Sequence, residues 1–156
     1  MLKRWSLDFA DDQGIKGSLV LTVADSTARF HAQIVVPDVG VVVVRDDDVP
    51  PPRLDPGRDD VVVVRAEGLW AELLCETPGE HWSIGLEAFG VRFDDEAEAA
   101  SSDRGERVPV GFDLEWETPD RVVGEVLVGR ARYDLDAHGT FIAPPPTPRS
   151  GVSSAQ

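Results

Sequence analysis

The 156-residue sequence contains one cysteine, Cys75, no asparagine, and two lysines against 13 arginines. A single cysteine excludes an internal disulfide bond and fits a reducing cytoplasm, which is the predicted localisation. No apolar run approaches the about 20 residues that a membrane-spanning helix requires. Two basic residues stand near the start, but no apolar stretch follows them. We therefore predict neither a signal peptide nor an integral membrane segment.

Positive charge is also scarce, because 15 lysine and arginine residues stand against 29 aspartate and glutamate residues. The formal net charge of −14 repels phosphate groups, so nucleic acid and anionic membrane surfaces are not expected partners. Apolar residues make up 42% of the chain, which is enough for a folded core. The length favours a single β-domain over residues 1–142, followed by a proline- and serine-rich tail, 143–156, that we expect to be disordered.

Sequence signatures of metal, nucleotide and nucleophile chemistry are missing. The histidines His31, His81 and His138 do not have the spacing of zinc ligands, either with one another or with the cysteine. The aspartate runs at 46–48 and 59–60 lack the glycine and terminal glutamate of a calcium loop. The sequence has neither a Gly-x-Ser-x-Gly elbow nor a glycine-rich phosphate loop. We therefore predict no metal and no cofactor.

Valine, by contrast, occurs 22 times, and β-branched side chains favour sheets over helices. A short apolar run at 41–44 is predicted to be covered on both faces. Residues 49–60 contain four prolines, which donate no amide hydrogen, so we predict a surface loop there. Alternating apolar residues and turn chemistry predict strands in the segments 5–9, 15–23, 28–36, 41–44, 61–66, 69–76, 81–93, 108–118, 122–128 and 131–136.

Helix-forming composition is confined to residues 94–100, a segment too short to be stable without tertiary support. Tight turns separate the strands, so neighbouring strands are expected to pair antiparallel. Eight to ten such strands must close or stack to cover their edges. We therefore predict an all-β fold, either an antiparallel barrel or a sandwich, with one short helix at most.

Carboxylates and tryptophans are interleaved in residues 67–89, a stretch that folds naturally as a hairpin about the Pro-Gly turn at 78–79, and again farther along the chain at 112–117. In a β-barrel, a wall of this kind can line a largely apolar cavity that has a few polar groups. The alternative interpretation is an outward polar face, with the tryptophans as ordinary core or edge cover. The residues predicted to bind a ligand are Trp70, Glu72, Trp82, Glu87 and Trp116.

The same stretch resembles a group of bacterial proteins that are similar to the lipocalin-like carotenoid hydratases (hydroxyneurosporene synthases). The resemblance covers residues 67–136 well and residues 5–65 loosely. The blocks that carry it are Gly68-Leu69-Trp70-Ala71, Cys75-Glu76, Glu80-His81-Trp82-Ser83, Gly85-Leu86-Glu87-Ala88-Phe89-Gly90-Val91, Val108-Pro109-Val110-Gly111-Phe112-Asp113-Leu114-Glu115-Trp116-Glu117-Thr118 and Gly124-Glu125-Val126-Leu127-Val128-Gly129.

This resemblance implies a lipocalin-like barrel or sandwich that holds an apolar ligand, with two such halves usual in the family and one half present here. The family's hydratases act on isoprenoid double bonds by acid–base chemistry, and their His-x-Trp signature follows a strand equivalent to residues 132–136. His138 aligns with that histidine, but no tryptophan stands two residues later. We therefore interpret His138 as a loop residue, with the catalytic role as the alternative.

Three functions are compatible with these sequence features. The predicted function is a non-catalytic lipocalin-like module that binds an isoprenoid or another lipid-like molecule, with a homodimer supplying the missing half. The second is an isoprenoid hydratase- or cyclase-like enzyme with Glu72, Glu87 and His138 as catalytic candidates, because a carboxyl group held against tryptophan has a raised pKa and can act as a general acid. The third is a structural β-domain without a ligand.

Overall fold

A computed structural model describes residues 2–52, 61–102 and 104–145. The predicted disorder of the tail at 146–156 and most of the predicted loop, at 53–60, lie outside the described residues. No helix in the described ranges has the length and apolar character needed to cross a bilayer. The elements are β1 Lys3–Ala10, β2 Lys16–Val23, β3 Ala28–Val36, β4 Gly40–Val49, β5 Val61–Ala66, β6 Leu69–Thr77, β7 His81–Phe93, α1 Glu96–Ser101, β8 Glu106–Glu117, β9 Arg121–Val128 and β10 Ala131–Ile142.

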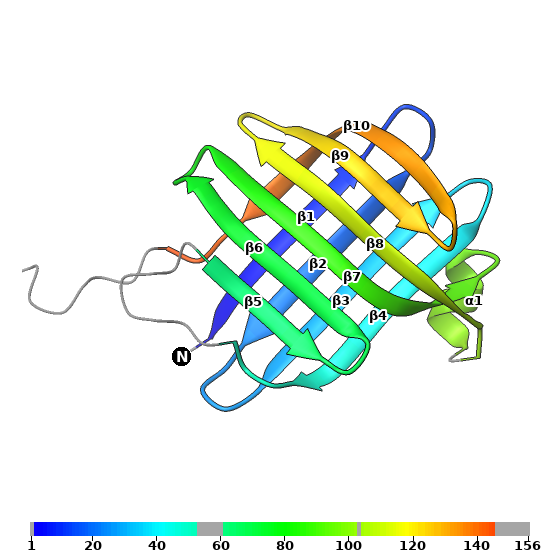
Figure 1. Ribbon diagram of the computed structural model, residues 1–156, viewed down its shortest axis with the longest axis horizontal. Helices are drawn as coiled ribbons and strands as arrows, with labels where there is room; N and C mark the ends of the chain where they lie inside the picture. Colours follow the sequence, from blue (N-terminus) through cyan, green and yellow to red (C-terminus); the bar gives the residue numbers. More distant parts are fainter. Residues whose placement is uncertain (1, 53–60, 103, 146–156) are drawn as a thin grey trace, which may run out of the picture.

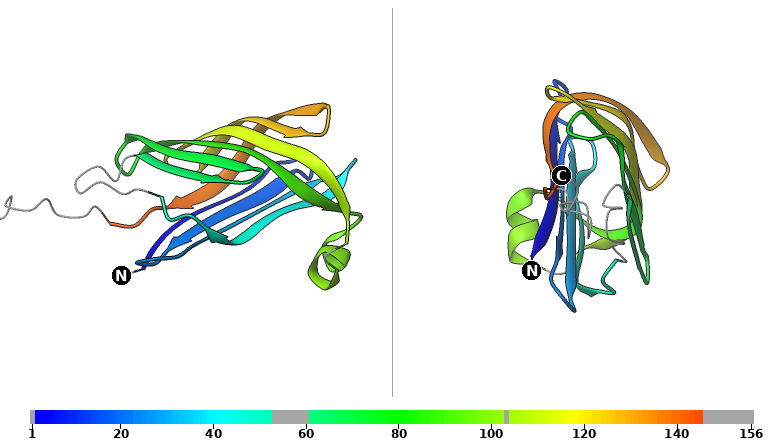
Figure 2. Two further views of the ribbon diagram at one scale, coloured as in Figure 1. Left: turned by 60° about the horizontal axis from the view of Figure 1, so that its bottom comes forward. Right: turned by 90° about the vertical axis from the view of Figure 1, so that its left-hand side faces the viewer.

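All ten strands belong to one antiparallel sheet, in the order β4-β3-β2-β1-β10-β9-β8-β7-β6-β5. The sheet folds over so that β1–β4 form a first layer and β5–β9 a second layer lying across it, with β10 joining the two (Figures 1 and 2). A short pairing of residues 41–43 in β4 with residues 91–93 in β7 partly closes the ring. The predicted all-β antiparallel barrel or sandwich, with one short helix, is therefore confirmed.

The core lies between the two layers and is built by the inward-facing alternate residues of each strand. Trp5 and Phe30 are the bulkiest fully buried side chains of the first layer, and Ile84 and Leu114 belong to the second. Among the described residues, no polar or charged side chain is buried. The alternation seen in the sequence thus separates an apolar interior from two polar outer faces.

Ring closure depends on local chemistry at the start of β4. Gly40 has a φ of 115°, and a Cβ at this position would overlap the carbonyl oxygen of Phe93 in β7. The helix α1 follows β7, begins where the Asp95 side chain accepts a hydrogen bond from the Glu98 amide at 2.8 Å, and packs against β4 and β7. Lys16 Nζ lies 2.8 Å from Glu96 Oε1. These contacts supply the tertiary support that so short a helix requires.

Candidate functional site

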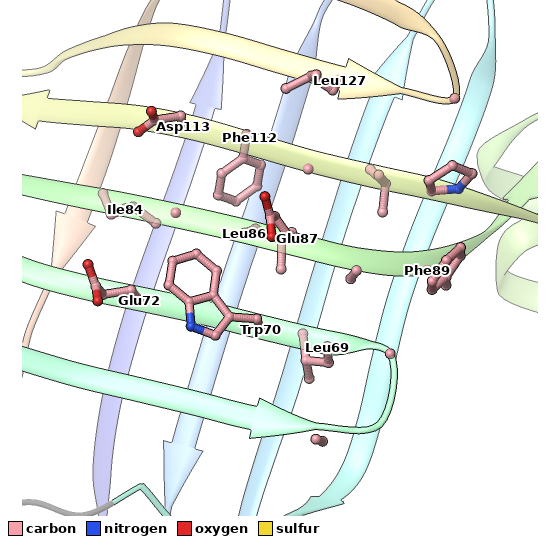
Figure 3. A pocket seen from close by; sticks show the side chains of 18 of the residues that line it. Leu69, Trp70, Glu72, Ile84, Leu86, Glu87, Phe89, Phe112, Asp113 and Leu127 are labelled. Atoms are coloured by element: carbon pink, nitrogen blue, oxygen red, sulfur yellow. The ribbon is translucent and has the colours of Figure 1, made fainter.

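A hollow of about 870 Å³ opens on the outer face of the second layer, over β6, β7 and β8 (Figure 3). The antiparallel register places its lining residues side by side on neighbouring strands. Trp70 of β6 pairs with Glu87 of β7, Glu87 pairs with Gly111 of β8, and Gly111 pairs with Leu127 of β9. Since side chains alternate along each strand, these four positions share the outer face. The hollow therefore has a half-buried indole at one side and an aliphatic side chain at the other.

Two glycines leave the floor of this hollow without side chains. Gly85 and Gly111 occupy outward positions on neighbouring strands, where other residues would cover the sheet with side chains. A Cβ on Gly85 would lie 3.4 Å from the Trp70 ring, so the indole lies directly over this bare strand. A Cβ on Gly111 would lie 2.6 Å from the Leu86 carbonyl oxygen, so that position has no room for a side chain. Glycine within a strand is typical of a site where another group approaches the backbone closely.

Three carboxylates surround the indole. Glu72 and Glu87 flank Trp70 in the view of Figure 3, and Asp113 lies across Gly85 from Glu72. None of the three carboxylates forms a hydrogen bond or ion pair with a described residue. Phe89, 53% exposed, marks the far end of the hollow, where the guanidinium carbon of Arg107 lies 4.6 Å from its ring centroid. The hollow thus combines an apolar floor and wall with an anionic rim.

The five residues predicted to bind a ligand do not line one cavity. Trp70, Glu72 and Glu87 line the hollow, whereas Trp82 and Trp116 point into the core and are 6% and 7% exposed. These two tryptophans pack against Phe141, with ring centroids 4.7 and 5.9 Å away, respectively. Alternation assigns Trp70 and Trp82 to opposite faces of the hairpin once they are placed in register, so the sheet itself separates them.

The interpretation of His138 as a loop residue is wrong, because it lies within β10, which runs to Ile142 rather than ending at residue 136. There it pairs with Ala10 of β1 and Arg121 of β9. Because β10 is paired with β1 on one side and β9 on the other, it continues past residue 136, where the alternating apolar residues of the sequence end. The side chain is exposed, and its Nδ1 lies 3.4 Å from an Asp120 carboxylate oxygen. His138 is therefore outside the hollow that holds the other two catalytic candidates.

A second group that sequence spacing missed lies at the far end of the same outer face. His81 Nε2 is 2.7 Å from Glu115 Oε1, and the potential ligand atoms of His81, Glu115 and Glu117 lie within 4.8 Å of one another. His81 and Glu115 are 34 residues apart in the chain, so no short motif records their contact. The register of β7 with β8 was the available signal, since His81 pairs directly with Glu117. The ion pair with Glu115 accounts for this arrangement without an added ligand.

Comparison with protein-family models, curated proteins and solved structures finds no match to this chain. The resemblance to carotenoid hydratases therefore stays a prediction.

Proposed function

We propose that the protein is a non-catalytic lipocalin-like module, located in the cytoplasm, that binds an apolar isoprenoid or lipid-like molecule beside Trp70. The observation that carries this proposal is the hollow itself. Its volume of about 870 Å³ falls within the range of about 300–1,000 Å³ that is typical of small-molecule sites. An indole standing over a bare glycine floor offers a flat apolar surface to a polyene or a fused ring, and burying that surface drives binding.

The charge of the rim favours a neutral ligand. Glu72, Glu87 and Asp113 stand around the indole without partners among the described residues, on a chain whose net charge is −14. A ligand that carries its own carboxylate would meet like charge around the indole, where these three carboxylates stand. A neutral isoprenoid alcohol or hydrocarbon avoids that repulsion and still gains the apolar contact. Within the lipid-like class, the proposal therefore selects neutral molecules over fatty acids.

The hydratase-like and structural alternatives have less support. Two of the three catalytic candidates, Glu72 and Glu87, share the hollow, but His138 lies outside it, and none of the three has a partner positioned to relay a proton through the hollow. A purely structural domain gives no reason for a half-buried indole that stands over a bare glycine on an outer face. Binding accounts for all of these features.

Enlarging Gly85 is expected to weaken binding. In Gly85→Leu the new side chain has no space under the indole, so it must displace the ring and take up room in the hollow. Farnesol, a neutral isoprenoid alcohol, should then bind at least about tenfold more weakly than to the wild type, because the lost apolar contact amounts to about two methylene groups or more. Gly85→Ala is the matched control, since its Cβ meets Trp70 at an ordinary contact distance. Isothermal titration calorimetry with farnesol and with palmitate measures both the site and its charge preference.

Three results would contradict the proposal in different ways. Equal farnesol affinity in Gly85→Leu and the wild type would place the ligand elsewhere. Tighter binding of palmitate than of farnesol would refute the role of the carboxylate rim. The absence of any farnesol binding by the folded wild type, checked by its thermal transition, would leave the structural alternative.

The proposal includes the homodimer predicted from the sequence, formed through the free edge of β5. Within the described part of the chain, β5 pairs with β6 alone, and it consists mainly of consecutive valines. An unprotected edge of this composition is a template for pairing with another strand. Val63→Lys places a charge on that edge, so light scattering at tens of micromolar should change from dimer to monomer. Val123→Lys, which places the same charge on the interior strand β9, is the control and should leave the dimer intact. A monomeric wild type would refute the proposed dimer.

A further inference from the structure

A second, smaller hollow lies on the outer face of the first layer, on the opposite side of the molecule from Trp70. Its volume is about 270 Å³, below the range of about 300–1,000 Å³ that drug-sized ligands require. Four strands contribute to it, and most of its polar lining residues are basic. The charged and polar lining residues are Arg4 of β1, Thr22 of β2, Arg29 and His31 of β3, and Arg45 and Asp47 of β4.

The sheet register brings these basic groups together from distant parts of the sequence. Arg4 pairs with Thr22, and Thr22 pairs with Arg29, so two guanidinium groups flank one hydroxyl in a single row. In the next row, His31 pairs with Arg45. Side chains two residues apart on a strand share a face, so the two rows form one patch.

The patch has a local excess of positive charge. Asp47 is its one carboxylate, and it lies 3.4 Å from Arg29 and 3.5 Å from Arg45. Arg4 forms no ion pair with any described residue. Three arginines against one aspartate leave two positive charges uncompensated, on a chain whose formal net charge is −14. At physiological ionic strength, the field of acidic groups farther than about 8 Å away is largely screened, so an approaching small anion is influenced mainly by the patch.

The positive charge of the patch acts on the pKa of His31. Burial lowers the pKa of His31, and the positive charges of Arg45 and Arg29 lower it further, while Asp47 acts in the opposite direction. From β2, the residue that faces the ring is the uncharged Val20. A bound anion would add negative charge beside the imidazole and so oppose this lowering of the His31 pKa.

We propose that this hollow binds a phosphate group, either free or as the monoester of a small molecule. Guanidinium groups match the oxygen geometry of phosphate and bind it through charge-assisted hydrogen bonds. The side chains of Arg29 and Arg45 are 65% and 64% exposed, so they are free to turn toward an anion, and Thr22 adds a hydroxyl donor. The charge of the whole chain still disfavours an extended polyanion such as nucleic acid, whose phosphates would reach beyond the patch.

The test follows the pKa values of the three histidines by proton NMR in inorganic phosphate and in sodium chloride of equal ionic strength. Phosphate should raise the pKa of His31 relative to chloride and leave His81 and His138, which lie outside the first layer, unchanged. Arg4→Gln and Arg29→Gln should each weaken phosphate binding by about tenfold, because each removes a charge-assisted hydrogen bond. Arg132→Gln is the matched control, since it removes an arginine of similar exposure that is paired with Glu125, away from the patch.

Glycerol 3-phosphate in place of inorganic phosphate distinguishes the two sources of the group. Equal affinity would identify free phosphate as sufficient, and tighter binding would identify a monoester, and either result supports the site. A His31 shift that chloride reproduces would overturn the proposal, and so would a loss of affinity in Arg132→Gln as large as that in Arg29→Gln. The titration of the wild type shows whether phosphate acts on His31 differently from chloride, even if a variant fails to fold.

Discussion

Replacing Trp5 by alanine is expected to lower the free energy of unfolding by about 3–5 kcal/mol. Trp5 is 0% exposed in the middle of β1, and in the antiparallel register it pairs with Leu21, which in turn pairs with Phe30. All three side chains point into the space between the layers. Removing the indole leaves a void that two hydrogen-bonded layers cannot collapse to fill. That cost is a large share of the about 5–15 kcal/mol that stabilises a typical domain.

Urea denaturation followed by far-UV circular dichroism measures this change, and Trp70→Ala is the matched control. Trp70 is also a strand tryptophan opposite a neighbouring strand, but it is half-buried on the outer face. Its truncation should cost less than about 2 kcal/mol, because much of the indole is already in water. Equal losses in the two variants would show that the core does not lie between the layers as described.

Replacing Gly40 by alanine is expected to cost about 3 kcal/mol or more, because two penalties combine. The φ of 115° is unfavourable for any residue with a side chain, and the new Cβ would overlap the carbonyl oxygen of Phe93. The strand start must then move away from β7. Since only residues 41–43 and 91–93 join these two strands, the partial ring closure should open.

Amide hydrogen exchange gives a local measure of that opening. Among the backbone amides at 41–43 and 91–93, those that point across the β4–β7 pairing should lose protection in Gly40→Ala, while those that join β1 to β10 keep it. Gly79→Ala is the control, because Gly79 has a φ of 73° but a Cβ there would meet nothing within 4 Å. That variant should cost about 1 kcal/mol, from backbone conformation alone. Comparable effects of the two substitutions would mean that the overlap with Phe93 is relieved without opening the ring.

The strands of this fold were predictable because their alternation is local. Trp5 and its neighbours, and the two strands about the turn at 78–79, follow the period of two along nearly their whole length, and the structure keeps their faces. The run at 41–44 was predicted to be covered on both faces, and three of its valines are buried while Val43 is half-buried. Pairing between β4 and β7 has no such local signal, since it depends on the shape of the whole folded sheet.

The site was less predictable, because alternation along a strand defines two faces without saying which of them is buried. Periodicity groups Trp70 with Glu72 and separates Trp82 from Glu87, but it does not reveal which of two faces meets the core. The lining that sequence reasoning missed includes Gly85, Gly111 and Asp113. A pair of outward-facing glycines on adjacent strands was the available signal, but it becomes visible only after the register of β7 and β8 is known.

The position of β10 has a consequence for how the protein is made. Among the described strands, β10 comes last in the sequence, and it inserts between β1, which comes first, and β9. Until β10 has been made, the nascent chain carries two open edges, on β1 and β9, and only the short pairing of β4 with β7 joins its first layer to its second. Completion of the sheet is therefore a late event that follows synthesis of nearly the whole domain, and the partly made chain is the form most in need of a chaperone.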